Sequence, residues 1–468
     1  MRRGWRGREQ RRAHARPIVT TSAAPVPPAP EQRTAADLPL PASLFGRAVF
    51  YGWYIVAAGL VASALSSGIQ AYGLGTFIRP MTEELGWSRT DISLGQTLST
   101  AVGGIIGLFI GGLIDRRGGR MLMIVGAIIG GAGFVGLGFV QTLWQYYLVK
   151  AVILTIGMAG MGPMIVNVAI SNWFVRRRGR AIAISAMGIS VGAFVVPSLA
   201  AWLIGQFGWR IAWMVFGVAV WVVIIPVAAV VMRRRPEDFG LEPDDGWVSS
   251  RAVSALDQRR ADADALEWTR REAMRTPTLW LLILTFGLAG MGVGALLLHL
   301  IAYLTDIGFS TAEAAFAFSM IGLSGLISKP FWGLLVERVA TRFVAAAEFV
   351  LLGVGILLVM MAPGLWLTAA AIFIFGVGVG GTLTVQETVW ADYYGRKTLG
   401  TVRSIGRPFT IVSSAGGPVL AGMAYDLGGS YEVAFSVFVV AYLGAAALIL
   451  FTPEPRHPGR ASVRAAST

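Results

Sequence analysis

Several cations of the sequence stand inside long apolar stretches, where a charge is costly. Lys329 lies in the run SKPFW, and Arg403 and Arg407 are four residues apart in a later stretch. A charged side chain at bilayer depth costs roughly a few kcal/mol or more, so it normally faces a cavity or a partner. Ammonium and guanidinium groups bind carboxylates through charge-assisted hydrogen bonds. These residues therefore predict an anionic substrate that contacts Lys329, Arg407 and Arg403.

Two of these cations also have a structural alternative. Lys329 is roughly two helical turns or less from Leu335, the inner end of its stretch, so its ammonium could snorkel to the interface. The same alternative applies to Arg403, which is near the end of its own stretch. Arg407 shares a helical face with Arg403 and lies about two turns in, so it is the deeper guanidinium.

Neutral polar residues in other apolar stretches could complete the substrate site. The best donors and acceptors among them are Gln70, Tyr72, Asn167 and Gln386. Each could instead bridge two helices, which is the commoner use of a lone amide or hydroxyl in a membrane bundle.

Two further residues could relay a proton or a charge. His299 is near the outer end of an apolar stretch, and an imidazole titrates close to neutral pH. An interfacial histidine with satisfied hydrogen bonds is the structural alternative. Glu387 is close to the inner end of another stretch, where it could pair with Arg403.

Other classes of chemistry find no support in the composition. The chain has no cysteine, which excludes disulfides and thiolate metal sites, and its three histidines are too scattered for a metal cluster. It contains no recognisable nucleophile–base set, so we expect neither an enzyme nor a cofactor. The net charge is +13, but the cations form short clusters between apolar stretches, which indicates membrane topology and not nucleic-acid binding.

The elements that must position these residues are membrane helices. Hydrophobic residues make up 55% of the chain, charged residues make up 14%, and the mean hydropathy is +0.65. Apolar runs of about 20 residues, the length needed to cross a hydrocarbon core, recur along the sequence. We predict an all-α membrane protein in the lipid bilayer with twelve transmembrane helices, at 51–77, 92–114, 121–140, 144–172, 181–207, 211–232, 279–303, 314–335, 343–362, 365–390, 399–425 and 433–451.

The twelve predicted helices form two repeats of six. The run ELGWS at Glu84 returns as DIGFS at Asp306, and the run GxLxDR at Gly111 returns as GxLxER at Gly333. Both pairs have the same offset, since 306 − 84 = 222 and 333 − 111 = 222. Such a duplication is typical of transporters with a substrate site between the halves. The expected organisation is a disordered basic tail (1–48), an N-terminal six-helix bundle (49–235), a cytoplasmic linker (236–276), a C-terminal six-helix bundle (277–453) and a C-terminal tail (454–468).

The positions of the cations predict the orientation, because Lys and Arg in short loops stay on the cytoplasmic side. Every second loop is rich in arginine, whereas the alternate loops are nearly bare. Only Arg79, Arg89 and Arg210 break this pattern. We therefore expect a multi-pass protein of the plasma (inner) membrane with both termini in the cytoplasm.

The run GGLIDRRGGR, from Gly111 to Arg120, resembles the signature loop of the major facilitator superfamily between its second and third helices. In that family the aspartate caps a neighbouring helix end and pairs with arginine, and this contact breaks as the transporter changes its facing. The resemblance implies the major facilitator fold. An ordinary positive-inside loop is the alternative. The residues that match the gating motif, with the echo in the second half, are Gly111, Asp115, Arg116, Gly118, Arg120, Glu337 and Arg338.

Within this superfamily the chain resembles the group of monocarboxylate transporters and oxalate:formate antiporters, through the runs ELGWS, WFVRRRGRA and HLIAYLTDIG. Lys329 stands where relatives carry a substrate-binding arginine in an Arg-Pro-Phe-type run. A second cation of the oxalate:formate group aligns near Thr410, so this role is carried over to the helix face of Arg407. Gly325 and Tyr72 replace the acid and the lysine of the proton-linked members, which puts proton symport by that route in doubt.

Together these features predict a secondary active transporter that moves a small organic anion, a mono- or dicarboxylate, by alternating access. The transporter would be an antiporter or a symporter, with a counter-anion or a proton as the second solute, or would act by facilitated diffusion. The alternative function is efflux of amphipathic organic compounds. In that case Lys329 and Arg407 would pair with Glu387 and contribute only structure.

Overall fold

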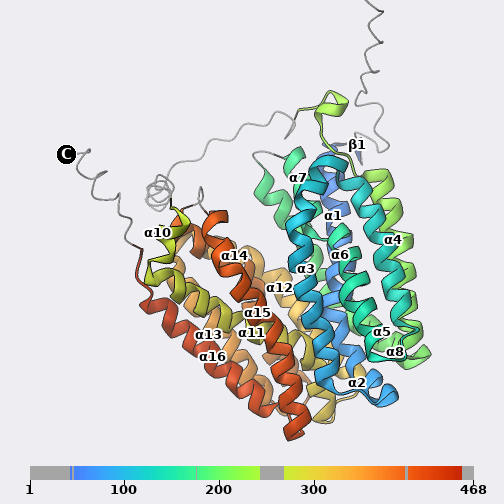
Figure 1. The fold of residues 1–468 in the computed structure, drawn as a ribbon, viewed down its shortest axis with the longest axis vertical. Helices are drawn as coiled ribbons and strands as arrows, with labels where there is room; N and C mark the ends of the chain where they lie inside the picture. The colour runs from blue at the N-terminus through green and yellow to red at the C-terminus, as the bar shows by residue number, and fades with distance from the viewer. Residues whose placement is uncertain (1–42, 45–46, 175–176, 243–267, 396–398, 456–468) are drawn as a thin grey trace, which may run out of the picture.

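The computed structural model describes residues 43–44, 47–174, 177–242, 268–395 and 399–455. Nearly all of them are helical (Figure 1). The strands β1 (Ser43–Leu44) and β2 (Arg47–Ala48) form one short antiparallel pair. Most of the predicted N-terminal tail, most of the predicted linker and most of the C-terminal tail lie outside the described residues.

The first half of the chain forms a bundle of long helical rods, three of which are interrupted. The first rod joins α1 (Gly52–Ser67), the π-helical segment η2 (Gly68–Gly73) and α2 (Leu74–Leu85). The next two are α3 (Arg89–Arg117) and α4 (Gly119–Leu137). The fourth joins α5 (Leu143–Tyr147), η3 (Leu148–Leu154), α6 (Thr155–Met161) and α7 (Pro163–Trp173). The last, α8 (Arg178–Val231), contains two helices that meet at Gly208, whose φ of 80° is not helical.

The second half repeats this arrangement. A short turn, η4 (Glu237–Phe239), and the helix α10 (Arg270–Met274) precede it. Its six long helices are α11 (Pro277–Asp306), α12 (Thr311–Arg338), α13 (Thr341–Met361), α14 (Leu365–Tyr394), α15 (Leu399–Gly428) and α16 (Glu432–Phe451).

Nine helices of the described residues are long and apolar enough to cross a membrane. This set counts α8 once, although α8 holds two segments on either side of Gly208. The set does not include α3 and α15, which are 29 and 30 residues long and occupy the second and eleventh predicted spans. The helices thus follow the twelve predicted spans in order, and the all-α class is confirmed.

The repeated sequence motif at the start of α3 and α12 forms a capping box in both halves. Ser88 accepts a hydrogen bond from the Asp91 amide at 3.0 Å, and Ser310 accepts one from the Glu313 amide at 3.3 Å. Gly86 precedes the first of these helices with a φ of 69°, a left-handed conformation that favours glycine. Local sequence therefore fixes where the second helix of each half begins.

Each half begins and ends at the same end of the molecule. The Tyr51 hydroxyl donates to the Val231 carbonyl oxygen at 3.0 Å, and the Thr278 hydroxyl donates to that of Pro453 at 2.9 Å. We call this the α10 end, because α10 also lies there, and we call the opposite one the distal end (Figure 1).

The two halves lie side by side, and three pairs of α-helices make most of the contact between them. These pairs are α12 with α8, α15 with α3, and α11 with α2. Figure 1 shows the ribbons of the two bundles converging at the distal end and diverging toward the α10 end. At Gly322 of α12 a Cβ atom would lie only 2.2 Å from the Phe194 amide nitrogen, so glycine permits the close approach of α12 to α8.

Candidate functional site

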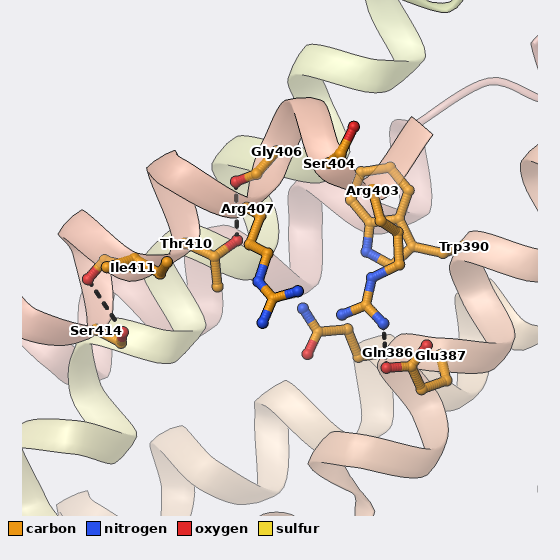
Figure 2. A pocket seen from close by; sticks show the side chains of 10 residues that line it. All are labelled: Gln386, Glu387, Trp390, Arg403, Ser404, Gly406, Arg407, Thr410, Ile411 and Ser414. Carbon is orange, nitrogen blue, oxygen red and sulfur yellow. Dashed lines mark hydrogen bonds and ion pairs between the residues drawn. The ribbon is translucent and has the colours of Figure 1, made fainter. Parts of the chain in front are cut away.

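A cavity of about 560 Å³ lies between α14 and α15 of the second half (Figure 2). Its α15 wall faces α3 of the first half: a Cβ atom at Gly104 would be 3.2 Å from Ile411 Cδ1, and one at Gly107 would be 3.8 Å from an Arg407 nitrogen. The cavity is therefore next to the contact between the halves. The side chains and glycine that line it are Gln386, Glu387, Trp390, Arg403, Ser404, Gly406, Arg407, Thr410, Ile411 and Ser414.

One charge pair inside this cavity is neutralised. Arg403 of α15 forms a hydrogen-bonded ion pair with Glu387 of α14, and their side chains are 34% and 48% exposed. Charges in contact with solvent attract each other weakly, so this pair contributes little to the stability of the fold. The predicted alternative for Glu387, pairing with Arg403, is what the geometry shows.

The second guanidinium of the cavity is unpaired. Arg407 has no hydrogen-bonding or ionic partner among the described residues, and its side chain is exposed to the cavity. Figure 2 shows it directed toward the space that the Gln386 amide also faces. Arginine offers five donors in a fixed fork, which matches the two oxygens of a carboxylate. The arrangement offers the donors of an unpaired guanidinium and of an amide to the same space.

The charge and shape of the cavity follow from residue spacing along α15. Arg403, Arg407, Ile411 and Ser414 are three or four residues apart, so they form one stripe along the helix. Thr410 and Ser414 donate their hydroxyl hydrogens to carbonyl oxygens of their own helix, at 3.2 Å each. Their oxygens can still accept hydrogen bonds from a ligand or from water.

Lys329 lies elsewhere on the contact between the halves. Its ammonium group donates to the Ser190 hydroxyl oxygen at 2.8 Å and to the Ala186 carbonyl oxygen at 3.2 Å, both in α8. These partners are neutral, so the positive charge is solvated but not cancelled. The side chain is half-buried between α12 and α8 and does not line the cavity of Arg407. It therefore does not snorkel to the membrane surface in this conformation.

The predicted neutral residues of the first half are not brought to this cavity. Gln70 and Tyr72 lie in η2, and the Tyr72 ring is 6.4 Å from that of Phe318 in α12, centroid to centroid. Asn167 lies in α7 and is half-buried. Gln386 is the one member of the predicted neutral set that lines the cavity.

His299 lies at the distal contact between the halves. Its imidazole is fully buried, with ring nitrogens 2.9 Å from the Ser93 hydroxyl and 2.9 Å from the Tyr431 hydroxyl. The structure thus shows the histidine with satisfied hydrogen bonds. Glu387 pairs with Arg403 and is not among the partners of His299, so no direct contact joins the two predicted relay residues.

The predicted gating loop lies at the α10 end. The chain turns there at Gly118, whose φ of 76° separates α3 from α4. Arg120 is exposed, and so are Glu337 and Arg338 at the end of α12. The side chains of Asp115 and Arg116, and the environment of Gly111, lie outside the described part of the chain. The gating role of these residues stays a prediction.

The sequence interpretation did not mention half of the residues that line the cavity. Trp390, Ser404, Gly406, Ile411 and Ser414 were not among the predicted site residues. The usable signal was the spacing of polar residues on the face of Arg407. Trp390 gives no such signal, because a tryptophan near a helix end is equally typical of a membrane interface.

Comparison with known proteins places this architecture in a family. Residues 60–328 and 305–467 match the Major Facilitator Superfamily. Monocarboxylate transporter 6 of Homo sapiens is 24% identical over 82% of this chain and 77% of its own length. The oxalate:formate antiporter of Oxalobacter formigenes is 22% identical over 88% of this chain and 94% of its own length.

A solved structure has the same fold. A bacterial homologue of the human lysosomal transporter Spinster, in an inward-facing and occupied conformation, superposes with a TM-score of 0.65 and 17% identity. The match covers 86% of this chain and 97% of that one. The paired bundles, the repeat at a fixed offset and a family match over most of the sequence agree: the chain belongs to the Major Facilitator Superfamily of membrane transporters.

Proposed function

We propose that this protein is a secondary active transporter that carries a small organic anion, a mono- or dicarboxylate, across the membrane by alternating access. The observation that carries the proposal is the unpaired Arg407 guanidinium in a cavity beside the contact between the halves. A cation left without a counter-charge at this depth is expected to have one supplied by the substrate.

The charge balance of the cavity supports an anion over an amphipathic compound. Arg403 and Glu387 cancel each other, so Arg407 leaves a net charge of about one positive unit among the charged lining residues. The efflux alternative requires Glu387 to neutralise Lys329 and Arg407. Instead Glu387 pairs with Arg403, and Lys329 contacts only neutral atoms of α8.

The shape of the molecule indicates from which end the substrate would enter during the transport cycle. The halves touch at the distal end and diverge toward the α10 end (Figure 1), so the substrate would enter the cavity of Arg407 from the α10 end. The arginine-rich loops favour a cytoplasmic location for that end in the plasma membrane. The conformation is then inward-facing, and both termini are cytoplasmic. The second solute would be a proton or a counter-anion.

The names of two relatives point to the class of substrate. One is a monocarboxylate transporter and the other an oxalate:formate antiporter, and both match along most of their length. Carboxylates suit the fork of a guanidinium better than spherical anions do, because two oxygens accept parallel hydrogen bonds. We therefore propose a carboxylate as the transported group.

The proposal can be tested with purified protein in liposomes and a panel of radiolabelled solutes. The panel contains mono- and dicarboxylates, nitrate as a small inorganic anion, and an amphipathic cation. We expect uptake of at least one carboxylate and a loss of its affinity of roughly tenfold or more in Arg407→Gln, which removes a charge-assisted hydrogen-bond donor.

The matched control is Arg79→Gln, because Arg79 is an exposed arginine that pairs with Glu83 on α2, outside the cavity. It should transport with the affinity of the unmodified protein. Transport of the amphipathic cation alone, or of carboxylates with equal affinity in both variants, would contradict the proposed function.

A further inference from the structure

A second group of polar residues joins the two halves at the distal end, away from the cavity. Its centre is Arg89, at the start of α3 in the first half. The two terminal nitrogens of Arg89 donate to the Asp306 carboxylate at 2.6 and 2.8 Å, and one also donates to the Tyr431 hydroxyl oxygen at 2.7 Å. Asp306 and Tyr431 belong to the second half, so a single arginine side chain crosses the contact.

The environment of Arg89 strengthens these bonds. The residue is only 7% exposed, and its guanidinium carbon lies 3.6 Å from the centroid of the Tyr425 ring. A bidentate arginine–carboxylate pair is among the stronger hydrogen-bonded pairs, and a ring face adds a cation–π attraction. Both depend on the exclusion of water, which holds only while the two halves are in contact.

A second acid of the same half binds the start of α3. The Asp426 carboxylate accepts hydrogen bonds from the backbone amides of Arg89 and Thr90, at 3.2 and 3.0 Å. Amides in the first turn of a helix have no partner within the helix and carry its positive dipole end. Asp426 therefore supplies, from the second half, the hydrogen-bond acceptor that these first-turn amides usually find in their own chain.

The buried imidazole of His299 completes the network. The nitrogen that faces the Pro418 carbonyl at 2.9 Å must donate, because a carbonyl oxygen only accepts. The same nitrogen is 2.9 Å from the Ser93 oxygen, while the Ser93 hydroxyl donates to the Arg89 carbonyl at 2.8 Å. The Tyr431 hydroxyl, which accepts from Arg89, is then free to donate to the other ring nitrogen at 2.9 Å.

The internal repeat explains why Asp306 takes its cation from the other half. Its equivalent is Glu84, at the offset of 222 residues. Glu84 accepts from Trp209 at 2.6 Å and from Arg210 at 3.0 Å, both in its own half.

The second half lacks this internal partner. At the offset of 222 residues, Tyr431 and Glu432 correspond to Trp209 and Arg210, with Ser430 as one extra residue after the turn glycines Gly208 and Gly429. An acid thus stands where the first half has a cation. Asp306 has no arginine to pair with at that position, and Arg89 of the first half takes its place.

We propose that Arg89, Asp306, Asp426 and Tyr431 form a lock that closes the distal end, and that the acid at position 432 leaves Asp306 available for it. We call these four residues the distal lock. The bonds that Asp306, Asp426 and Tyr431 make with Arg89 and Thr90 all join different halves, so they break whenever the distal end opens. The distal lock thus sets the balance between the two facings of the transporter.

The inference concerns the equilibrium between the conformation with a closed distal end and the one with an open distal end. It rests on the proposed function only in that transport uses both conformations. Its test needs no substrate. The chain contains no cysteine, so a single introduced cysteine reports accessibility without background labelling. Ser319→Cys is a suitable reporter, because Ser319 is 1% exposed and lies 3.1 Å from Ser198 of the other half.

The experiment measures the rate at which a water-soluble thiol reagent labels Ser319→Cys in purified protein in nanodiscs. Arg89→Gln should raise this rate by roughly tenfold to a hundredfold, the range expected for losing hydrogen bonds to a charged group. Glu432→Arg should raise it too, because the new cation competes with Arg89 for Asp306. Glu432→Gln should leave it nearly unchanged, since it adds no cation that could compete with Arg89 for Asp306.

The matched control is Glu84→Gln, which breaks a similar pair at the same end but within one half. It should leave the labelling rate unchanged. If Arg89→Gln misfolds, Arg89→Lys keeps the charge without the fork and should give an intermediate rate. Equal rates in Arg89→Gln and Glu84→Gln, or no effect of Glu432→Arg, would overturn the distal lock. A failure of the carboxylate panel would leave these rates unaffected, so the two proposals fail separately.

Discussion

The ion pair between Arg403 and Glu387 predicts that one substitution in the cavity will tighten the binding of an anion. Glu387→Gln removes the carboxylate that neutralises Arg403, so the charge contributed by Arg403, Glu387 and Arg407 rises by one unit. Arg403 and Arg407 are four residues apart on one helix, which separates their Cβ atoms by about 6 Å. A carboxylate bound to Arg407 then gains attraction from a second cation at roughly that distance.

The size of this gain follows from Coulomb's law. Two unit charges about 6 Å apart attract by roughly 0.7 kcal/mol in bulk water and roughly 2.8 kcal/mol at an effective dielectric constant of about 20. The side chains of Arg403 and Glu387 are 34% and 48% exposed, so the value should lie toward the lower end. We expect about 1 kcal/mol, which is roughly fivefold tighter binding of a monocarboxylate, and a larger gain for a dicarboxylate.

The assay is equilibrium binding of the substrate found in the liposome panel, measured for both a mono- and a dicarboxylate. The control is Glu83→Gln, which removes the partner of Arg79 on the surface of α2 and should not change affinity. The reasoning would be refuted if Glu387→Gln bound the monocarboxylate no better than the unmodified protein, or lost it. Either result would mean that Glu387 positions Arg403 for the substrate and does not compete with it.

Two further predictions concern Lys329 and the membrane orientation. Lys329→Gln should weaken substrate binding by up to tenfold, because a cation is lost from the contact between the halves, whereas Lys329→Arg should retain or improve binding, because it supplies a fork. Equal affinity in the unmodified protein and in both variants would mean that Lys329 only holds α12 against α8, through its hydrogen bonds with Ser190 and Ala186. Reporter fusions after Arg235 should report the cytoplasm and fusions after Val140 the outside, and the reverse result would invert the proposed orientation.

The fold was largely predictable from sequence because its determinants are local. Apolar length sets the spans, and the capping boxes at Ser88 and Ser310 set where two of them begin. The interruption at Gly208 was predicted as a loop between the fifth and sixth spans and is a single non-helical residue. The π-helical segments η2 and η3 were not predicted, since no residue pattern distinguishes them from α-helix.

The site was predictable only in part, because its geometry depends on which helices meet. Arg403, Arg407 and Glu387 follow from charges in apolar runs, and the structure brings these three together. Lys329 follows from the same argument but contacts α8 instead of the cavity. A sequence can indicate that a charge requires a partner, but the partner of Lys329 is 139 residues away and depends on how the halves dock.

One residue of the distal lock, Arg89, was already exceptional in the sequence, because it does not follow the distribution of cations that membrane topology predicts. Arg79, Arg89 and Arg210 are the exceptions to the cation pattern of the loops. The structure gives each of them an acid: Glu83, Asp306 and Glu84. Of the three pairs, only that of Arg89 joins the two halves. An arginine in one of the loops that otherwise lack cations therefore predicts an acidic partner on the same side of the membrane. The repeat then distinguishes the pair that reports conformation: Glu84 and Arg210 recur as Asp306 and Glu432, and the lost cation predicts a contact with the opposite half.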